Sequence, residues 1–255
     1  MIKKENKVRK SAFDLNWFLD ELKNKTSSIK YVSGYQTYSQ GKSIFECSEH
    51  GEYSSVPHLV IKRDGKGCPS CTELARRKPV CGVGNNDVLG YDRRDYYLWY
   101  NVVRRGTNSL KSYEDVTCHE DWLTFSKFLE DLPLIDNFEM RENSDWELDK
   151  DLLSGKRKMY SKDTTCFLPR EINACIAVGK NEDNIVGVIF DKEISKFFAC
   201  LMMDGRRRRF GSFYTTGEAF EKYKELKMAE VSRLAEKHRL NLTDRVYEAL
   251  KAWTP

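Results

Sequence analysis

The sequence predicts an α+β protein built from three successive parts, and three observations lead to this prediction. Near the N-terminus, cysteine and histidine residues occur in two closely spaced pairs, as in small metal-stabilised domains. In the middle, aromatic residues recur at helical spacing. Near the C-terminus, three short strand patterns precede one long helical pattern. We expect the parts to span residues 1–78, 79–178 and 184–255.

The composition predicts a cytoplasmic protein without a membrane segment. No apolar run is long enough to cross a bilayer, and the first residues lack the apolar core of a signal peptide. The eight cysteines are therefore expected to be thiols and metal ligands rather than disulfides. Lys and Arg number 43 against 39 Asp and Glu. This near balance is weak evidence for a polyanionic partner, so the local clustering of cations matters more.

The first part carries a predicted zinc site. Cys47 and His50 form a C-x2-H pair, and Cys68 and Cys71 form a C-x2-C pair. A two-residue gap lets both side chains of a turn reach one ion, and the insert between the pairs leaves room for a hairpin. A site with four protein ligands is structural, so we expect one zinc ion that stabilises a unit with little core. The alternative is a set of unrelated thiols and an exposed histidine.

A helix is predicted before this site from apolar residues at helical spacing, namely Phe13, Trp17, Phe18 and Leu22. Together with the segments FECSEHGEY and GKGCPSC, it resembles the zinc-ribbon domains that are frequent in phage proteins. Such ribbons are attached to many nuclease and DNA-binding cores. The resemblance therefore implies a fold and a metal but no particular activity.

Two helices are predicted in the second part, each with an apolar face. The first face is formed by Tyr97, Trp99, Tyr100 and Val103. The second is formed by Trp122, Phe125, Phe128, Leu129 and Leu132. We expect these side chains to form the core. Cys118 and Cys166 are also expected in the core, with a second zinc site that includes Cys81 or Cys175 as the alternative.

Short motifs follow one another through the second part. They are Trp99, then Val116, Cys118, Trp122, Phe125 and Phe128, then Leu148 to Asp151, Tyr160 and Ser161, Thr165 to Pro169, and Ile172 with Asn173. This series resembles the HNH-like cores of small phage homing endonucleases. The resemblance implies a ββα-metal core with flanking helices, in which a strand, a turn and a helix hold one divalent ion against the scissile phosphate.

The resemblance also implies roles for individual residues. Asp149 and Asn173 would hold magnesium or another divalent cation through a carboxylate and an amide oxygen. Lys150 occupies the position of the usual catalytic histidine, and because lysine is a poor base at neutral pH we expect it to contact phosphate. His119 is a further catalytic candidate, and the alternative is an exposed residue that opens a helix. The alternative for Asp149 and Lys150 is a solvated turn.

One segment departs from the family pattern. The chain reads Gly155, Lys156, Arg157 and Lys158 where the family usually has Gly-Asn-Lys. Without that asparagine the metal loop would be looser, and Asp151, Asp163 or His119 would have to substitute. Lys156 and Arg157 are expected to contact DNA.

The third part is predicted to be a three-stranded antiparallel sheet packed on a helix. Asp204 and Gly205 indicate a hairpin, and Thr216 is expected to cap the helix. That helix would cover one face of the sheet and leave the other free for a ligand. A terminal amphipathic helix, with Leu234, Leu240, Leu242, Val246, Leu250 and Trp253, is expected to dock on it. Residues 76–79, 133–144 and 177–184 have the composition of linkers.

A further set of residues carries a second resemblance. They are Gly187, Val188, Lys196, Phe197, Ala199, Gly205, Phe210, Gly211, Phe213, Thr215, Glu218, Ala219 and Tyr223. They are similar to the ethylene-response-factor (apetala) type of DNA-binding domain, whose sheet lies in the major groove. Duplex DNA is therefore the partner that the resemblance implies.

Strand alternation identifies the residues expected to face DNA. It places Arg207 and Arg209 opposite Phe210 and Val188, so these two arginines are the first candidates for guanine contacts. Flanking contacts, mostly to phosphate, are expected from a second set of residues. These are Lys192, Lys196, Arg206 and Ile189. The alternative is a solvated basic hairpin.

The leading interpretation is a site-specific, metal-dependent DNA endonuclease of the phage homing type, encoded by a phage or mobile element and acting in a bacterial host cell. One core per chain favours a monomer that nicks a single strand. The first alternative is a former homing endonuclease that has lost cleavage and acts on DNA as a regulator or interference factor. The second alternative is a protein-interaction module.

Overall fold

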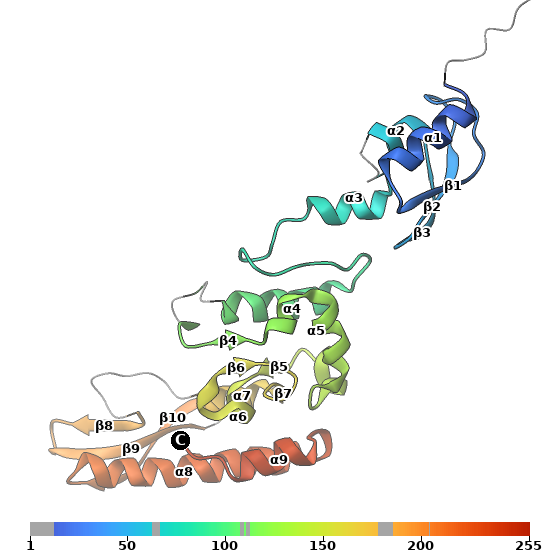
Figure 1. Cartoon of the computed structure of the whole chain (residues 1–255). Coiled ribbons are helices and arrows are strands. Elements are labelled where there is room, and N and C mark those ends of the chain that lie inside the picture. The colour runs from blue at the N-terminus through green and yellow to red at the C-terminus, as the bar shows by residue number, and fades with distance from the viewer. Residues whose placement is uncertain (1–12, 63–66, 108–109, 111–112, 178–185, 204) are drawn as a thin grey trace, which may run out of the picture. The chain divides into compact units, whose positions relative to one another are not determined.

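A computed structural model describes residues 13–62, 67–107, 110, 113–177, 186–203 and 205–255. The fold is mixed α+β with several small sheets, as expected (Figure 1). The chain divides into two compact units: Met1–Pro79 with Asn86–Gly90, and Val80–Asn85 with Tyr91–Pro255. Within the described ranges, no helix is both long enough and apolar enough to cross a bilayer.

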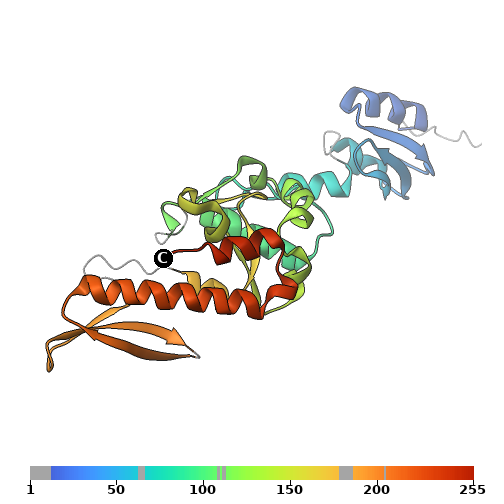
Figure 2. The same ribbon diagram turned by 90° about the horizontal axis from the view of Figure 1, so that it is seen from below.

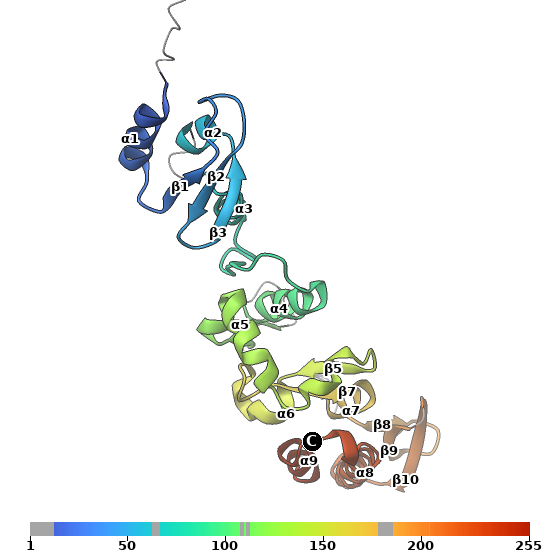
Figure 3. The ribbon, with the colours of Figure 1, turned by 90° about the vertical axis from the view of Figure 1, so that its right-hand side faces the viewer.

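The first unit is an antiparallel sheet of order β1-β2-β3 with three helices (Figure 3). Its elements are α1 (Leu15–Lys25), β1 (Ile29–Ser33), β2 (Ser43–Cys47), β3 (Gly51–Ser55), α2 (Pro57–Lys62) and α3 (Pro69–Arg76). The predicted first helix is confirmed for Phe18 and Leu22, which are buried against Phe45 of β2 and Val60 of α2, whereas Phe13 precedes α1 and is 45% exposed. Apolar burial between helix and sheet therefore supplies the core of this unit.

The path of the chain between the two ligand pairs differs from the prediction. A hairpin was expected after His50, but residues 48–50 are themselves the turn of the β2–β3 hairpin. The insert continues as β3 and then as the helix α2, which begins at Pro57. Proline is well suited to the first turn of a helix, where its missing N–H would have no partner in any case.

The middle of the chain forms the centre of the second unit. Its helices are α4 (Arg93–Gly106), η2 (Glu120–Leu123), α5 (Phe125–Asp131), η3 (Leu132–Leu134), η4 (Phe138–Glu142), α6 (Asp151–Ser154), η5 (Gly155–Arg157) and α7 (Arg170–Ile176). Its strands are β4 (Thr117–Cys118), β5 (Trp146–Asp149), β6 (Met159–Tyr160) and β7 (Cys166–Pro169). β4 pairs with β6 in parallel, and β5 pairs with β7 antiparallel. Two small sheets therefore lie among short helices.

The two predicted aromatic helices are confirmed only in part. Trp99 and Val103 of α4 are buried, but Tyr97 is 53% exposed and is not a core residue. The second helix is broken into η2, α5 and η3, which carry Trp122, Phe125 with Phe128, and Leu132. All four of these side chains are nevertheless buried. Apolar spacing therefore identified the core better than it identified the helix ends.

The C-terminal region is a three-stranded antiparallel sheet covered by a long helix (Figure 2). Its elements are β8 (Val188–Asp191), β9 (Lys196–Met203), β10 (Arg206–Phe213), α8 (Thr216–Lys237), η6 (Arg239–Asn241) and α9 (Asp244–Lys251). Ala199 and Leu201 of β9 pack against Tyr223 of α8. The predicted sheet and helix are confirmed, and Asp204 of the predicted hairpin turn lies outside the described residues.

Three details of this region differ from the prediction. Thr215, rather than Thr216, caps α8, because its hydroxyl accepts from the N–H of Glu218 in a capping box. Leu234 belongs to α8, and Leu240 is 99% exposed, so the terminal amphipathic helix is shorter than expected. It is α9, whose Val246 and Leu250 are buried.

Residues 133–144, which have the composition of a linker, are in fact part of the fold. They include η4 and most of η3, and Asn137 within them is buried. Residues 178–184 of the third linker-like segment lie outside the described residues. Short 3-10 turns carry no periodic apolar pattern, which explains why the sequence alone did not distinguish this segment from a loop.

Candidate metal centre and nucleic-acid interface

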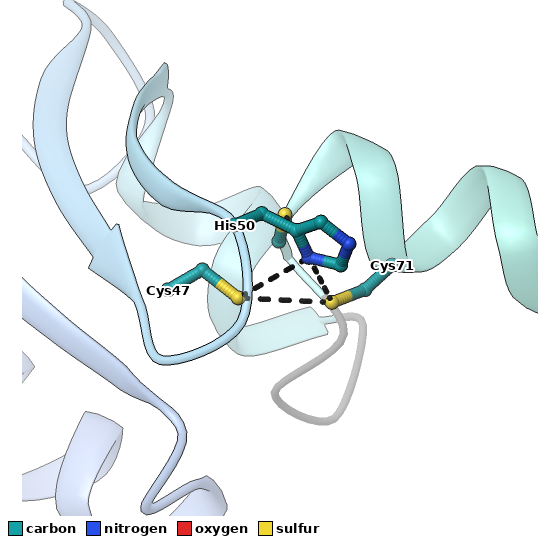
Figure 4. A group of neighbouring side chains, drawn as sticks. Cys47, His50 and Cys71 are labelled. Carbon is teal, nitrogen blue, oxygen red and sulfur yellow. Dashed lines mark hydrogen bonds between the residues drawn. The ribbon is translucent and has the colours of Figure 1, made fainter. Parts of the chain in front are cut away.

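The four predicted zinc ligands lie at the ends of regular elements of the first unit. Figure 4 shows three of them, Cys47, His50 and Cys71, turned toward one another. Cys47 ends β2 and His50 closes the turn that leads into β3. Gly51 follows with a φ of +71°, which a residue with a side chain rarely adopts. Cys68 is the N-cap of α3, and Cys71 lies in its first turn. Two tight turns therefore present the four side chains to one point.

The distances among these ligand atoms fit a single metal ion. The Sγ atoms of Cys47 and Cys71 are 3.7 Å apart, and His50 Nδ1 lies 3.7 Å from the Sγ of Cys47 and 3.2 Å from that of Cys71. Cys68 Sγ is also 3.7 Å from His50 Nδ1. A tetrahedral zinc site has edges of about 3.8 Å between sulfurs and about 3.6 Å between sulfur and nitrogen. The four residues lie close together and could hold a metal ion.

The pKa values of two thiols in this cluster are shifted in opposite directions. Burial disfavours the Cys47 thiolate, but hydrogen bonds from the Glu49 and His50 backbone and from the His50 ring outweigh it and lower the pKa of Cys47 to about 7. Burial, together with the neighbouring Cys47 and Cys68, raises the pKa of Cys71 to about 12. Several thiolates close together repel one another, and a bound cation removes that repulsion.

Tyr53 is a neighbour of the cluster that the sequence did not reveal. It lies on β3, its ring stacks on Phe45 at 5.7 Å, and its buried hydroxyl has no hydrogen-bond partner within the described residues. Burial first, and then the three cysteines, raise the pKa of this phenol. A tyrosine six residues after a metal ligand has no distinctive sequence signature.

The second candidate site lies on the antiparallel pair β5 and β7 and on the helix α7 that follows. Asp149 is the last residue of β5 and pairs with Cys166 of β7. Asn173 lies on α7 and donates from Nδ2 to Glu147 Oε2 at 3.0 Å. Arg170 donates from Nε to Glu147 Oε1 at 2.9 Å. Glu147 therefore connects α7 to the strand that ends in Asp149, and the sequence analysis did not select it.

Asp149 and Lys150 are both buried, with 4% and 6% of their surface exposed. The alternative of a solvated turn is therefore wrong for them. Asp149 Oδ2 accepts from the N–H of Leu152 at 2.9 Å, so this carboxylate stabilises the start of α6, and burial raises its pKa. Lys150 Nζ lies 2.6 Å from Asp151 Oδ1 and 5.6 Å from the centre of the Tyr160 ring.

Tyr160 contacts His119, Arg105 and Lys150. Its backbone carbonyl accepts from the N–H of His119 at 2.9 Å, and its hydroxyl accepts from Arg105 Nη1 at 3.3 Å. His119 itself is an exposed residue whose Nδ1 accepts from the N–H of Asp121, so it opens η2 as the alternative reading expected. Arg105, in the last turn of α4, is a further residue that the sequence analysis missed.

The remaining predicted residues of this site are dispersed. Arg157 and Asp163 are exposed, Asp151 pairs with Lys150, and the side chain of Lys156 lies outside the described residues. Cys166 is buried as expected. Within the described ranges, the N-terminal cluster is the one group of three or more His, Cys, Asp or Glu residues with ligand atoms in mutual reach.

The third candidate site is the face of the C-terminal sheet that α8 does not cover. Directly paired residues of antiparallel strands point to the same face. Arg207 pairs with Met202 and Arg209 with Cys200, whereas Ala199, on the covered face, pairs with Phe210. Arg207 and Arg209 therefore share the open face, as strand alternation predicted.

The expected flanking residues occupy different positions around this face. Lys192 is exposed in the turn between β8 and β9. Lys196 is directly paired with Asp191, and its Nζ lies 2.8 Å from the centre of the Tyr214 ring. Arg206 pairs with Met203 at the exposed start of β10, and the register turns it toward the face that α8 covers.

Comparisons of the chain with protein-family models, with curated proteins and with solved structures find no match. What this protein does is therefore inferred from its own residues and their geometry.

Proposed function

We propose that this protein is a site-specific, metal-dependent DNA endonuclease that nicks one strand. In this proposal the open face of the β8–β10 sheet recognises the target DNA sequence, and residues of β5, β7 and α7 form the site that cleaves the strand. The observation that carries the proposal is the pair of exposed arginines, Arg207 and Arg209, on the one face of the sheet that α8 leaves uncovered.

The charge of this hairpin supports a polyanionic partner. Arg206 to Arg209 are four consecutive exposed cations, which concentrate positive charge on one strand of the sheet. A two- or three-stranded ribbon fits the major groove, where an arginine pairs with guanine O6 and N7 through two hydrogen bonds. Lys192 and Lys196 at the edges would bind phosphates and set the orientation of the sheet on the duplex.

We assign zinc to the N-terminal cluster. Three thiolates and one imidazole are a donor set typical of structural zinc, and harder ions such as magnesium and calcium prefer oxygen ligands. With all four positions filled by Cys47, His50, Cys68 and Cys71, no position remains for a substrate. The ion would stabilise the first unit and take no part in cutting.

The donor groups of the second site fit a divalent cation. Asn173 uses its amide nitrogen to bind Glu147, which leaves its side-chain oxygen as an acceptor. Asp149 accepts at Oδ2 from the N–H of Leu152 and also accepts from the N–H of Asp151, and a carboxylate with its two oxygens has lone pairs left for a cation. A carboxylate and an amide oxygen are ligands that magnesium accepts, and a bound ion would activate water and stabilise charge on the phosphate.

The cations around Tyr160 support the binding of a phosphodiester at the same place. Arg105 is partly buried, and within the described residues no carboxylate lies within 4.0 Å of its guanidinium. Lys150 is adjacent to Asp149, and its Nζ lies 5.6 Å from the centre of the Tyr160 ring. A strand of DNA at this site would supply the missing negative charge. Lys150 is thus assigned to phosphate binding rather than to proton transfer.

A second candidate function is site-specific DNA binding without cleavage, as in a domesticated homing endonuclease that acts as a regulator or interference factor. The burial of Asp149 and Lys150 favours it, because a metal ligand that already caps a helix in the interior has less access to a phosphate. Both candidates use the same sheet to bind DNA, so they differ only in whether the second site cleaves it.

One experiment separates the possibilities. Duplexes that the full chain retains from a randomised pool are cloned into a supercoiled plasmid, which is then incubated with the protein and Mg²⁺. We expect the wild type and the control Asp20→Ala, an exposed carboxylate on α1, to nick the plasmid and Asp149→Ala to leave it supercoiled. Binding without nicking by any variant would support the second candidate, and the absence of any retained duplex would exclude both.

A further inference from the structure

Arg209 does not extend freely from the open face but lies across it. It stands on β10, one edge strand of the sheet, and its Nη1 is 3.1 Å from Oδ2 of Asp191 on β8, the opposite edge strand. Its guanidinium carbon is 5.5 Å from the centre of the ring of Phe198, on the central strand β9. The arginine therefore reaches over Phe198 to the far side of the sheet.

Asp191 is held in place on both of its oxygens. Oδ1 accepts from the backbone N–H of Glu193 at 3.1 Å, within the β8–β9 turn, and Oδ2 binds Arg209. An ion pair whose arginine is 54% exposed contributes little to stability. The pair fixes the position of the guanidinium, because Nη1 of Arg209 binds Asp191 while the Nε and Nη2 edge has no hydrogen-bond partner among the described residues. That edge has the spacing required for guanine O6 and N7.

Phe198 and Ile189 form an apolar strip directly beside this guanidinium. They are directly paired on the open face, and both are partly buried. In the major groove the base edges present one apolar group, the C5 methyl of thymine. An apolar strip beside an arginine that is aimed at guanine therefore suits a thymine in the neighbouring base pair.

From this juxtaposition we infer that the open face reads a guanine next to a thymine. Arg209 binds the guanine, Phe198 with Ile189 contacts the thymine methyl group, and Asp191 is a positioning residue that orients Arg209. The inference rests on the proposed binding of duplex DNA by this face, and it is independent of whether the second site cuts.

The test begins with the full chain and the duplexes that it retains from a randomised pool. We expect the aligned sequences to contain a guanine next to a thymine. Replacing that thymine by uracil removes only the methyl group and should weaken binding about fourfold, the effect of exposing one buried methyl group. Replacing the guanine by 7-deazaguanine should weaken binding about tenfold. Uracil at a distant thymine of the same duplex is the control.

Protein variants assign these effects to residues. In Phe198→Ala the preference for thymine over uracil should fall to well under half, with Ile189 alone left beside the methyl group, whereas Phe198→Leu should keep most of it because leucine keeps a large apolar side chain. Asp191→Asn should reduce the preference for guanine over adenine at the Arg209 position about tenfold while keeping affinity for unrelated duplexes. Glu193→Gln, which removes the same charge from the same turn without a contact to Arg209, should leave that preference unchanged.

The outcomes distinguish this inference from the proposed function. Retained duplexes without a guanine beside a thymine, equal binding of thymine and uracil by the wild type, or a full uracil penalty in Phe198→Ala would each overturn the inference and leave DNA binding intact. A loss of guanine preference in Glu193→Gln equal to that in Asp191→Asn would remove the positioning role. If no duplex is retained at all, the proposed function itself is wrong.

Discussion

Asn137 connects two segments that lie 106 residues apart in the sequence, because its Oδ1 accepts a hydrogen bond from the backbone N–H of Thr243 at 2.7 Å. Its Nδ2 donates to the carbonyl oxygen of Phe167, also at 2.7 Å. Asn137 is buried and has a φ of 61°, a conformation that asparagine adopts more readily than most residues. One side chain thus joins the start of α9 to β7.

We expect Asn137→Ala to lower the free energy of unfolding by about 2 to 4 kcal/mol, because it removes both hydrogen bonds and leaves a buried carbonyl unpaired. Urea unfolding of the full chain, followed by circular dichroism, measures this change. Asn101→Ala on the exposed side of α4 is the control and should change stability by less than about 0.5 kcal/mol. An equally small effect of Asn137→Ala would contradict the structural role of this contact.

The purified protein should contain one tightly bound zinc ion per chain, and Cys71→Ser should lose it, because serine oxygen is a poor replacement for a thiolate ligand. Elemental analysis after dialysis against a chelator measures the metal content. Cys81→Ser is the matched control, since Cys81 is exposed and lies outside the cluster. Equal zinc content in both variants would rule out the assigned ligand set.

The contact between α7 and the end of α8 should make stability depend on pH. Burial favours the protonated form of Glu171, but hydrogen bonds from Lys237 and His238 outweigh burial and lower the pKa of this carboxyl. A lowered folded-state pKa gives stability that is present above the unfolded-state pKa and is lost as pH falls through the folded-state pKa.

The corresponding variant is Glu171→Gln. The difference in unfolding free energy from wild type should be a few tenths to about 1 kcal/mol near pH 6, because the group is partly exposed. It should begin to fall as pH approaches the ordinary glutamate pKa of about 4.3 and should be lost once pH lies below the lowered folded-state pKa. Urea unfolding at a series of pH values measures it. A difference that stayed constant down to pH 3, or that appeared equally in the exposed control Glu114→Gln, would argue against this ion pair.

Loss of either Arg207 or Arg209 should weaken binding to a selected duplex by about 1 to 3 kcal/mol and relax the preference at one base pair. Fluorescence anisotropy on the selected duplex and on single-base variants measures both effects. Arg93→Ala, an exposed arginine at the start of α4, should leave both unchanged. A uniform loss on every sequence would indicate phosphate contacts instead.

Glu147→Gln should raise the Mg²⁺ concentration required for half-maximal nicking about 10- to 100-fold, because Glu147 orients Asn173 and carries the negative charge behind it. Plasmid nicking over a Mg²⁺ series measures this effect. Stability should change by less than about 1 kcal/mol, since the Glu147 side chain is 42% exposed. An unchanged Mg²⁺ requirement, matching the exposed control Glu139→Gln, would remove Glu147 from the site.

The parts of the fold that the sequence predicted are those set by local patterns. Periodic apolar residues identified Phe18 and Leu22 of α1 and Trp99 and Val103 of α4 as buried, and strand alternation placed Arg207 and Arg209 on the open face. The predictions that were wrong concern the ends of helices and the segments without periodic apolar residues. One example is the second aromatic helix, which is broken between η2 and α5. A 3-10 turn and a short helix use similar residues, and tertiary packing decides between them.

By itself, the sequence determined the two pairs of candidate metal ligands and the basic face of the sheet, because each pair lies within one turn and the face lies within one strand. The tertiary structure alone decided that Asp149 and Lys150 are buried, that Glu147 holds Asn173, that Arg209 lies across the sheet to Asp191, and that Asn137 meets Thr243. Each of these contacts joins separate elements or depends on their packing. Such burial and such hydrogen-bond partners depend on how the whole chain packs, and the spacing of residues along the sequence does not predict them.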